Sequence, residues 1–281
     1  MSGDWDGWAA EEARRIRAAG RWRAVRDVDG PGPEVVLPDG RRAVSFASND
    51  YLGLTRHPAV VEAARRALDE WGAGAGSARL VAGSRPVHGE LEAELADWKG
   101  AEAAVLFSTG FAANLGVLQA FGGPGVRVVS DELNHASIVD GCRLSRSEVV
   151  VVPHGDVAAV ERAVAAAPGR ALVVAESVYS MDGDAAPVVA LVEVCARAGA
   201  LLVLDEAHAV LGPELPAGPR GVVLRVGTLS KALASVGGFV AGPADLCALV
   251  VNRARSFVFT TAGPPAAAAA ALAALRVLRS P

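Results

Sequence analysis

Residues 201–208 read Leu-Leu-Val-Leu-Asp-Glu-Ala-His, an aliphatic run that ends abruptly in two acids and a histidine. Apolar runs of the same kind recur along the chain, and helix-length segments separate most of them. They lie at residues 103–107, 126–129, 149–152, 171–175 and 222–226. Apolar strands without polar alternation, separated by helices, are typical of a parallel sheet buried on both faces. The sequence therefore predicts an α/β fold whose mainly parallel sheet is covered by helices on both faces.

The segments before this region have their own local patterns. Residues 9–28 are predicted to form an Arg-rich helix and its exit. Residues 34–37 and 43–46 are predicted to pair as a hairpin about Pro38-Asp39-Gly40. Residues 57–71 and 87–98 have the apolar spacing of helices. We therefore expect an N-terminal arm of helix and hairpin over residues 1–45 and a large domain over residues 46–263.

The last segment, residues 264–281, has a helical pattern that opens at Pro264-Pro265. Its apolar positions are expected to pack against something beyond the end of the chain: Ala268, Leu272, Leu275 and Leu278. The chain stops at Pro281 without a capping glycine, so this helix is interpreted as the start of a C-terminal domain that is missing.

Composition excludes several classes of protein. Lys and Arg total 27 against 31 Asp and Glu, a net charge of −4, whereas nucleic-acid binders usually carry a basic stripe. The longest apolar run, residues 266–275, is half the length of a membrane span. The three cysteines, Cys142, Cys195 and Cys247, lie far apart and are expected to be buried thiols. We expect a cytoplasmic protein without nucleic-acid or membrane partners.

The polar residues after the apolar runs are the candidate site, because ligands of parallel sheets bind beyond the carboxyl ends of the strands. Ser108-Thr109-Gly110-Phe111 leads into a helix whose free N–H groups suit a phosphate. Asp205 at a buried strand end needs a cation or a donor. Lys231 closely follows another buried strand, where a lysine with a lowered pKa suits Schiff-base chemistry.

The order of these features indicates a cofactor. A phosphate-type turn, His135, a polar turn over residues 176–184, Asp205 with His208, and Lys231 are the groups that pyridoxal phosphate (PLP) requires. The sequence contains no Walker A motif, no G-x-G-x-x-G and no G-x-S-x-G nucleophile elbow. It also contains no H-E-x-x-H or other tight histidine pair, so no metal site is expected.

Six motifs resemble those of the α-oxoamine synthases, PLP enzymes of fold type I, the aspartate aminotransferase fold. They are Asn49-Asp50-Tyr51-Leu52-Gly53-Leu54, Ser108-Thr109-Gly110-Phe111-Ala112-Ala113-Asn114, Asn134-His135-Ala136-Ser137, Ser180-Met181-Asp182-Gly183-Asp184, Asp205-Glu206-Ala207-His208 and Thr228-Leu229-Ser230-Lys231. The resemblance runs from about Arg21 to the C-terminus, with the motifs in family order.

The resemblance implies a role for each candidate residue. Lys231 would hold PLP as a Schiff base and later remove the α-proton of the amino-acid substrate. Asp205 would keep the pyridine nitrogen protonated, and His135 would stack on the ring and contact the substrate. His208 and Ser180 would lie near the phenolic oxygen.

Further implied contacts concern the phosphate, the substrate and a partner subunit. Gly110 and Phe111 would offer backbone N–H groups, and Thr228 would contact the phosphate. Arg21 aligns with a substrate-contacting arginine. The family also implies a homodimer with shared active sites, in which Thr260 and Thr261 would reach the partner's phosphate.

The reaction that the resemblance implies is condensation of L-alanine with a pimeloyl thioester, on coenzyme A or acyl carrier protein. Loss of CO2 then yields 8-amino-7-oxononanoate, an intermediate of biotin biosynthesis. Glycine C-acetyltransferase and 5-aminolevulinate synthase use the same machinery, and these motifs separate the three activities poorly. A truncated, non-catalytic PLP-fold protein is the alternative from another class.

Three departures from the family pattern bear on that alternative. Residues 209–212 are shorter than the family's glycine-containing stretch after His208. Residues 232–234 read Ala-Leu-Ala where the family often has a glycine. Members of the family also continue into a further C-terminal domain. The chain is therefore expected to bind PLP, to turn over poorly and to associate through an exposed apolar face.

Overall fold

A computed structural model describes residues 4–30, 32–209 and 223–280, and the chain divides into two compact units, Met1–Ser48 and Asn49–Pro281. The first unit contains helix α1 (Trp5–Ala18) and an antiparallel pair of strands, β1 (Glu34–Val36) and β2 (Arg42–Val44). Asp4 caps α1 by accepting a hydrogen bond from the N–H of Gly7. The predicted hairpin is confirmed, with Gly40 at φ +81° in its turn.

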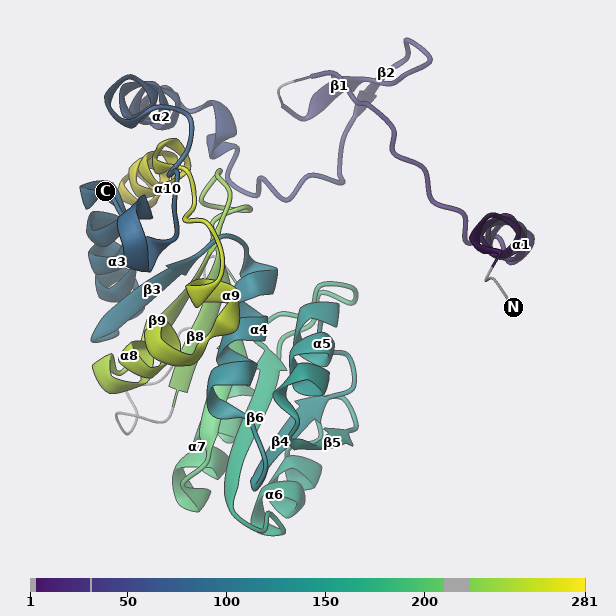
Figure 1. Ribbon diagram of the computed structural model, residues 1–281, viewed down its shortest axis with the longest axis vertical. Coiled ribbons are helices and arrows are strands. Elements are labelled where there is room, and N and C mark those ends of the chain that lie inside the picture. Colours follow the sequence, from purple (N-terminus) through teal and green to yellow (C-terminus); the bar gives the residue numbers. More distant parts are fainter. Residues whose placement is uncertain (1–3, 31, 210–222, 281) are drawn as a thin grey trace. The chain divides into compact units, whose positions relative to one another are not determined.

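In the second unit, the described residues form a seven-stranded sheet in the order β3-β9-β8-β7-β6-β4-β5 (Figure 1). The strands are β3 (Ala103–Phe107), β4 (Val126–Asp131), β5 (Glu148–Val152), β6 (Arg170–Glu176), β7 (Leu201–Asp205), β8 (Val223–Thr228) and β9 (Gly238–Gly242). Strands β5, β4, β6, β7 and β8 are parallel, whereas β9 is antiparallel to both β8 and β3. The mainly parallel sheet is confirmed.

Strand β9 is the member of the sheet that the sequence pattern missed. It is short and begins and ends with glycine, which is unfavourable for a strand by propensity alone. The fold requires the first of these glycines: a Cβ on Gly238 would lie 2.5 Å from the carbonyl oxygen of Thr109. The glycine therefore lets β9 pass close to the turn that precedes helix α4 (Gly110–Phe121).

Helices cover both faces of the sheet, as Figure 1 shows. The α-helices in the described part of the second unit are α2 (Pro58–Trp71), α3 (Pro86–Lys99), α4 (Gly110–Phe121), α5 (Ala136–Ser145), α6 (Val157–Ala165), α7 (Val188–Ala198), α8 (Ala244–Arg253), α9 (Arg255–Val258) and α10 (Pro265–Leu278). One core lies between the sheet and helices α4, α5, α8 and α9. On the other face, α2, α3 and α10 cover β3 and β9, and α6 and α7 cover β5, β6 and β7.

Successive residues of a central strand belong to different cores, which explains the unbroken apolar runs. Leu172 and Val174 of β6 lie in the core beneath α4 and α5, whereas Val173 and Ala175 lie in the core beneath α6 and α7. Because side chains alternate between the faces of a strand, a sheet covered on both sides needs apolar residues at every position.

The expectation for the last helix is wrong in one respect. Ala268, Leu272 and Leu275 are buried, and they pack within the second unit against α2 and α3 rather than facing something beyond the chain. Apolar residues of α2 and α3, such as Val60 and Leu91, supply the complementary surface. The periodicity identified the buried face of the helix but not its partner.

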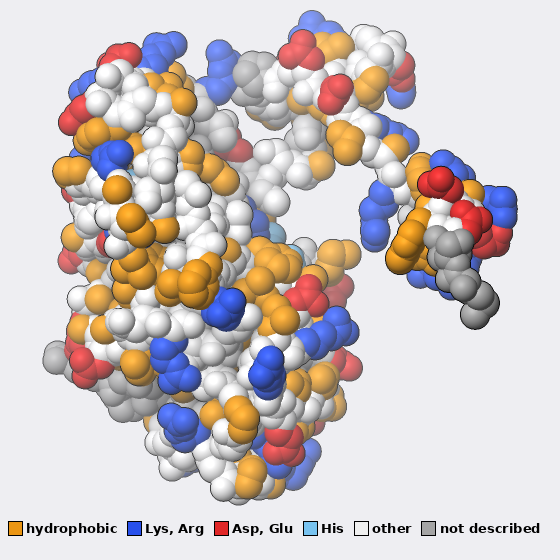
Figure 2. Space-filling view, in the orientation of Figure 1, with side chains coloured by type: hydrophobic (Ala, Val, Ile, Leu, Met, Phe, Trp, Pro, Cys, Tyr) orange, Lys and Arg blue, Asp and Glu red, His pale blue; other side chains and the backbone are white. Residues whose placement is uncertain are grey.

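The surface and the thiols agree with the composition. On the face shown in Figure 2, Lys and Arg side chains (blue) are interspersed with Asp and Glu (red). The three cysteines are free and buried, as predicted. Within the described residues, no helix combines the length and the apolar character required to cross a bilayer.

Candidate active site

A cavity of about 220 Å³ opens where β6, β7 and β8 end and α4 begins. It is lined by residues from five separate segments of the chain, among them Gly110, His135, Glu176, Asp205, His208 and Lys231. The carboxyl ends of parallel strands lie at one edge of the sheet, so the polar residues that follow them meet there. The structure thus brings together most of the predicted site residues.

Asp205, the last residue of β7, is 5% exposed at the floor of this cavity. Its Oδ2 accepts a hydrogen bond of 2.6 Å from Nδ2 of Asn114, and its Oδ1 accepts one of 2.8 Å from the N–H of Ala207. Burial raises the pKa of Asp205, and these two donors together with Lys231 and His135 partly oppose that shift. A buried carboxylate in this position is favourable only beside a cation or further donors.

Asn114 was part of a quoted motif but had no assigned role. Its Nδ2 also donates to Oγ of Ser137 at 2.9 Å, so both amide protons are used. Its Oδ1 is buried, and among the described residues it has no hydrogen-bond partner. A polar residue inside the largely apolar helix α4 was the available signal. The carboxylate of Asp205 can only accept hydrogen bonds, so the NH2 group of the Asn114 side chain, and not its oxygen, faces Asp205.

Lys231 and His208 form a close pair. Nζ of Lys231 lies 2.5 Å from Nε2 of His208, and Nδ1 of His208 lies 2.7 Å from the hydroxyl of Tyr51. Burial lowers the pKa of Lys231, although Asp205 and Glu176 oppose the shift. Burial, Lys231 and His135 lower the pKa of His208 to about 4. The imidazole is therefore neutral at pH 7, and its Nε2 can accept a hydrogen bond from the amine.

The chain has only two lysines, Lys99 and Lys231. Lys99 ends α3, and its Nζ is 2.7 Å from Oε2 of Glu206 in an ion pair that is almost completely buried. That ion pair engages the amine of Lys99, which is not among the residues that line the cavity. Lys231 lines the cavity and is the lysine suited to react with a carbonyl group.

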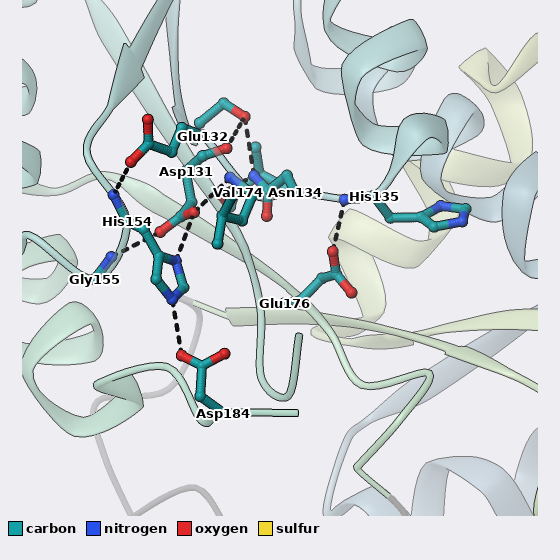
Figure 3. Close-up of polar contacts among 11 residues, drawn as sticks. Asp131, Glu132, Asn134, His135, His154, Gly155, Val174, Glu176 and Asp184 are labelled. Carbon is teal, nitrogen blue, oxygen red and sulfur yellow. Dashed lines mark hydrogen bonds and ion pairs between the residues drawn. The ribbon is translucent and has the colours of Figure 1, made fainter. Parts of the chain in front are cut away.

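His135 caps helix α5, with its Nδ1 2.7 Å from Oγ of Ser137. Its ring lies 6.4 Å from that of Phe111 in an edge-to-face arrangement, and both rings line the cavity. Its backbone N–H donates to Oε1 of Glu176 at 2.6 Å, while the imidazole points away from that carboxylate (Figure 3). The hydrogen bond from the backbone of His135 to Glu176 thus fixes where the imidazole lies at the cavity.

Glu176 is a site residue that the sequence analysis left without a role. It ends β6 and pairs in register with Asp205 of β7, so two buried carboxylates lie side by side at the sheet edge. Burial and the charge of Asp205 raise the pKa of Glu176 to about 7. The backbone N–H groups of His135 and Ser180 favour its ionised form. The rule that identified Asp205, an acid directly after an apolar run, applies equally to Glu176.

The turn into α4 has the geometry expected of an anion site. Thr109 caps the helix, and its Oγ1 accepts from the N–H of Ala112 at 3.0 Å. Gly110 and Phe111 begin the helix beside Thr228, and all three line the cavity. A Cβ on Gly110 would lie 3.3 Å from Cβ of Thr228, so the glycine permits this close approach. Free N–H groups and the helix dipole favour an anion here.

Four predicted residues lie elsewhere. Ser180 is exposed in the turn after β6, although its N–H bonds Glu176 at the cavity. Thr260 and Thr261 line a second, smaller cavity of about 30 Å³ with His88. Arg21 belongs to the first unit, where it is exposed. The roles given to these four stay predictions. Of the shortened stretch 209–212, only Ala209 is among the described residues.

Comparison with known proteins places these features in a family. Residues 41–279 match the family described as aminotransferase class I and II. The chain is 46% identical over 286 residues to the 8-amino-7-oxononanoate synthase of Geobacter sulfurreducens, covering 97% of this chain and 72% of that protein. It is 51% identical over 280 residues to the enzyme of the same name from Anaeromyxobacter sp. (strain K), covering 96% and 70%.

A solved structure is similar over nearly the whole chain. Serine palmitoyltransferase from S. paucimobilis, in a variant with a bound PLP–myriocin aldimine, superposes with a TM-score of 0.86. The two chains are 33% identical, and the match covers 99% of this chain and 73% of the other. Fold type I, expected from the motifs, is therefore confirmed.

Proposed function

This chain belongs to the class I and II aminotransferase family and, within it, to the α-oxoamine synthases, and from that premise we propose its reaction. It joins L-alanine to a pimeloyl thioester with release of CO2 and forms 8-amino-7-oxononanoate. The observation that carries the proposal is the meeting of a lysine with a lowered pKa and a buried aspartate at one cavity. Those two groups are the ones that PLP-dependent carbanion chemistry requires.

The residues at the cavity fit PLP. A buried carboxylate with a raised pKa is stabilised by a protonated ring nitrogen, so Asp205, oriented by Asn114, would hold that nitrogen. Thr228 and the backbone N–H groups at Gly110 and Phe111 would hold the phosphate. His135 would lie against the ring, and Lys231 would bind its carbonyl carbon.

PLP, when bound, supplies an electron sink for the negative charge that develops at the α-carbon of the amino acid. The chain contributes the proton transfers. Nζ of Lys231 takes the α-proton, which requires the neutral amine that burial favours. Nε2 of His208 accepts a hydrogen bond from that amine, and this contact fixes the direction of the lone pair on Nζ of Lys231. Tyr51 in turn orients the imidazole through Nδ1.

The choice among acyl donors is tested by direct competition. The purified chain, loaded with PLP, is given L-alanine with pimeloyl-CoA, glycine with acetyl-CoA or succinyl-CoA, and L-serine with palmitoyl-CoA, and products are identified by mass spectrometry. We expect 8-amino-7-oxononanoate to dominate, because both curated relatives compared above carry that enzyme's name. A preference for any other pair would overturn the substrate assignment.

We also propose that the chain works in the cytoplasm as a homodimer in which Thr260 and Thr261 of one protomer contact the phosphate in the other. These threonines follow α9 and precede Gly263-Pro264-Pro265, at the place where the family resemblance puts the partner's segment. Light scattering of the PLP-loaded protein should give twice the mass of the chain. An active preparation that contains only monomer would contradict the shared site.

A further inference from the structure

His154, to which the sequence assigned no role, is the centre of a polar cluster formed with Asp131, Glu132 and Asp184 (Figure 3). Its Nδ1 lies 3.0 Å from Oδ1 of Asp131, the last residue of β4, and its Nε2 lies 2.8 Å from Oδ2 of Asp184 in the loop between β6 and α7. Its ring packs edge-to-face on Tyr179, with 4.4 Å between centroids. One side chain thus joins three loops at the carboxyl ends of β4, β5 and β6.

The two contacts determine the charge of the ring. An ionised carboxylate can only accept hydrogen bonds, and a neutral imidazole has a single N–H. Both contacts can therefore be hydrogen bonds only when His154 is an imidazolium. Asp131 and Asp184 raise the pKa of His154 accordingly. Glu132 adds a third carboxylate, whose Oε1 accepts from the backbone N–H of His154 at 2.9 Å.

Asp131 holds one side of the His154 ring in a fixed position. It is 9% exposed and also accepts from the N–H groups of Leu133 and Gly155, both at 2.9 Å. Burial alone would raise the pKa of Asp131, but these N–H groups and the side chains of His154 and Tyr179 lower it. The carboxylate is therefore ionised, and it fixes the imidazolium to the end of β4.

The loop over residues 177–186 is held at two places. Its base is fixed to β7, because the N–H and Oγ of Ser177 donate to the carbonyl of Asp205 at 2.8 and 3.1 Å. Within the loop, Tyr179 N–H bonds the carbonyl of Asp184 at 3.0 Å, and Ala186 N–H bonds that of Ser177 at 3.0 Å. The far side of the loop is held by Asp184 on His154.

Ser180 lies between these two attachments, with its N–H bonded to Glu176 at the cavity. We propose that His154 is a positioning residue: as an imidazolium between Asp131 and Asp184, it holds the 177–186 loop so that the backbone N–H of Ser180 stays bonded to Glu176 at the cavity where PLP would bind. The part that concerns Ser180 and PLP rests on the proposed function. The part that concerns the loop does not.

Hydrogen exchange measures the loop without PLP or substrate. His154→Gln replaces the ring with a neutral side chain, and Asp184→Asn removes the charge that the ring contacts while leaving His154 in place. In both variants the amides of residues 179–186 should exchange roughly tenfold faster, the scale of one charge-assisted hydrogen bond. The control is His57→Gln, a histidine that caps α2 outside the cavity, and it should leave this loop unchanged.

A double variant distinguishes loss of the contact between His154 and Asp184 from a general increase in the mobility of the loop. Since both side chains make the same contact, His154→Gln with Asp184→Asn should exchange no faster than the single variants. Asp184 is on the surface, so its variant folds even where His154→Gln does not. Wild-type exchange in Asp184→Asn would overturn the proposal for the loop.

PLP affinity provides the second readout. Spectroscopic titration of the two variants should give dissociation constants roughly tenfold weaker than wild type. It should also give a wild-type constant that weakens as the pH rises through the pKa of His154, with that added dependence absent from His154→Gln. A faster loop with unchanged PLP affinity would overturn the positioning of Ser180. Failure to form 8-amino-7-oxononanoate would concern the proposed function alone, because neither readout uses substrate.

Discussion

Nζ of Lys231 lies 2.5 Å from Nε2 of His208, and burial lowers the pKa of both groups. Two basic nitrogens at this distance repel each other when both are protonated. The stable combination is therefore the amine beside a neutral imidazole. Because Tyr51 contacts Nδ1 of His208, the hydrogen-bonded chain begins at a residue some 180 positions before Lys231 in the sequence. The reactive amine is therefore held by tertiary contacts.

Lys231 is expected to carry PLP covalently. After PLP is added and the protein is reduced with borohydride, peptide mass spectrometry should find the phosphopyridoxyl group on Lys231 alone. Lys231→Ala should abolish the covalent adduct, whereas Lys99→Arg should keep it, since Lys99 is engaged with Glu206. With only two lysines in the chain, the assignment is unambiguous. An adduct on Lys99, or none at all, would refute it.

Asp205→Asn should retain part of the PLP affinity but lose most of the activation of the substrate. An amide cannot hold the proton on the ring nitrogen, and the loss of a preorganised charge partner costs roughly 3 kcal/mol. The measurement is exchange of the α-proton of L-alanine in deuterated water, followed by NMR, with Asp140→Asn on the surface of α5 as the control. Exchange near the wild-type rate would contradict the role of Asp205.

The raised pKa of Glu176 predicts a specific pH dependence of the stability of the protein. Its pKa is raised to about 7 in the folded state, so its contribution to stability is complete below the unfolded value near pH 4 and is lost as the pH rises through 7. Glu176→Gln should therefore reduce the loss of stability of the PLP-free protein between pH 5 and pH 8, by at most about 3 kcal/mol.

Chemical denaturation at several pH values tests this, with Glu161→Gln as a control. Glu161 is on the surface of α6, where it forms an exposed ion pair with Arg197. Its variant should follow the wild-type pH profile. Parallel profiles for wild type and Glu176→Gln would show that the carboxyl titrates normally.

The backbone conformation of Ala234 predicts that a glycine at this position stabilises the protein. It has φ +53°, in the left-handed region that alanine adopts at a cost of about 1 kcal/mol. It is the third residue after Lys231, within the stretch where the resemblance leads one to expect glycine. Ala234→Gly should raise the free energy of unfolding by about 0.5 kcal/mol, after allowing for the greater entropy of the unfolded glycine chain.

Ala232 is the matched control for that prediction. It is buried two residues earlier and has no positive φ, so Ala232→Gly should destabilise the protein by about 1 kcal/mol. Thermal unfolding of the two variants should therefore move in opposite directions. Destabilisation by both would mean that the backbone at Ala234 is not strained.

The sheet could be predicted because its determinants are local. Apolar runs such as residues 171–175 are unbroken because each face of the sheet is buried, and that requirement is visible in the residues themselves. Strand β9 could not be predicted in this way. Gly238 and Gly242 are unfavourable in a strand, and the place of β9 between β3 and β8 is determined by close backbone contacts that only the folded chain has.

For the candidate site, the sequence by itself determined which residues end or closely follow the strands: Asp205 at the end of one apolar run, Lys231 shortly after another and the Thr109-Gly110 turn after a third. Only the tertiary structure decided which other side chains join them. Asn114 reaches Asp205 from α4, and Glu176 lies beside Asp205 through strand register. His154 joins the end of β4, 23 residues before it, to a loop residue 30 residues after it. A strand end is specified by neighbouring residues, whereas a buried hydrogen bond between distant segments exists only after the sheet has brought them together.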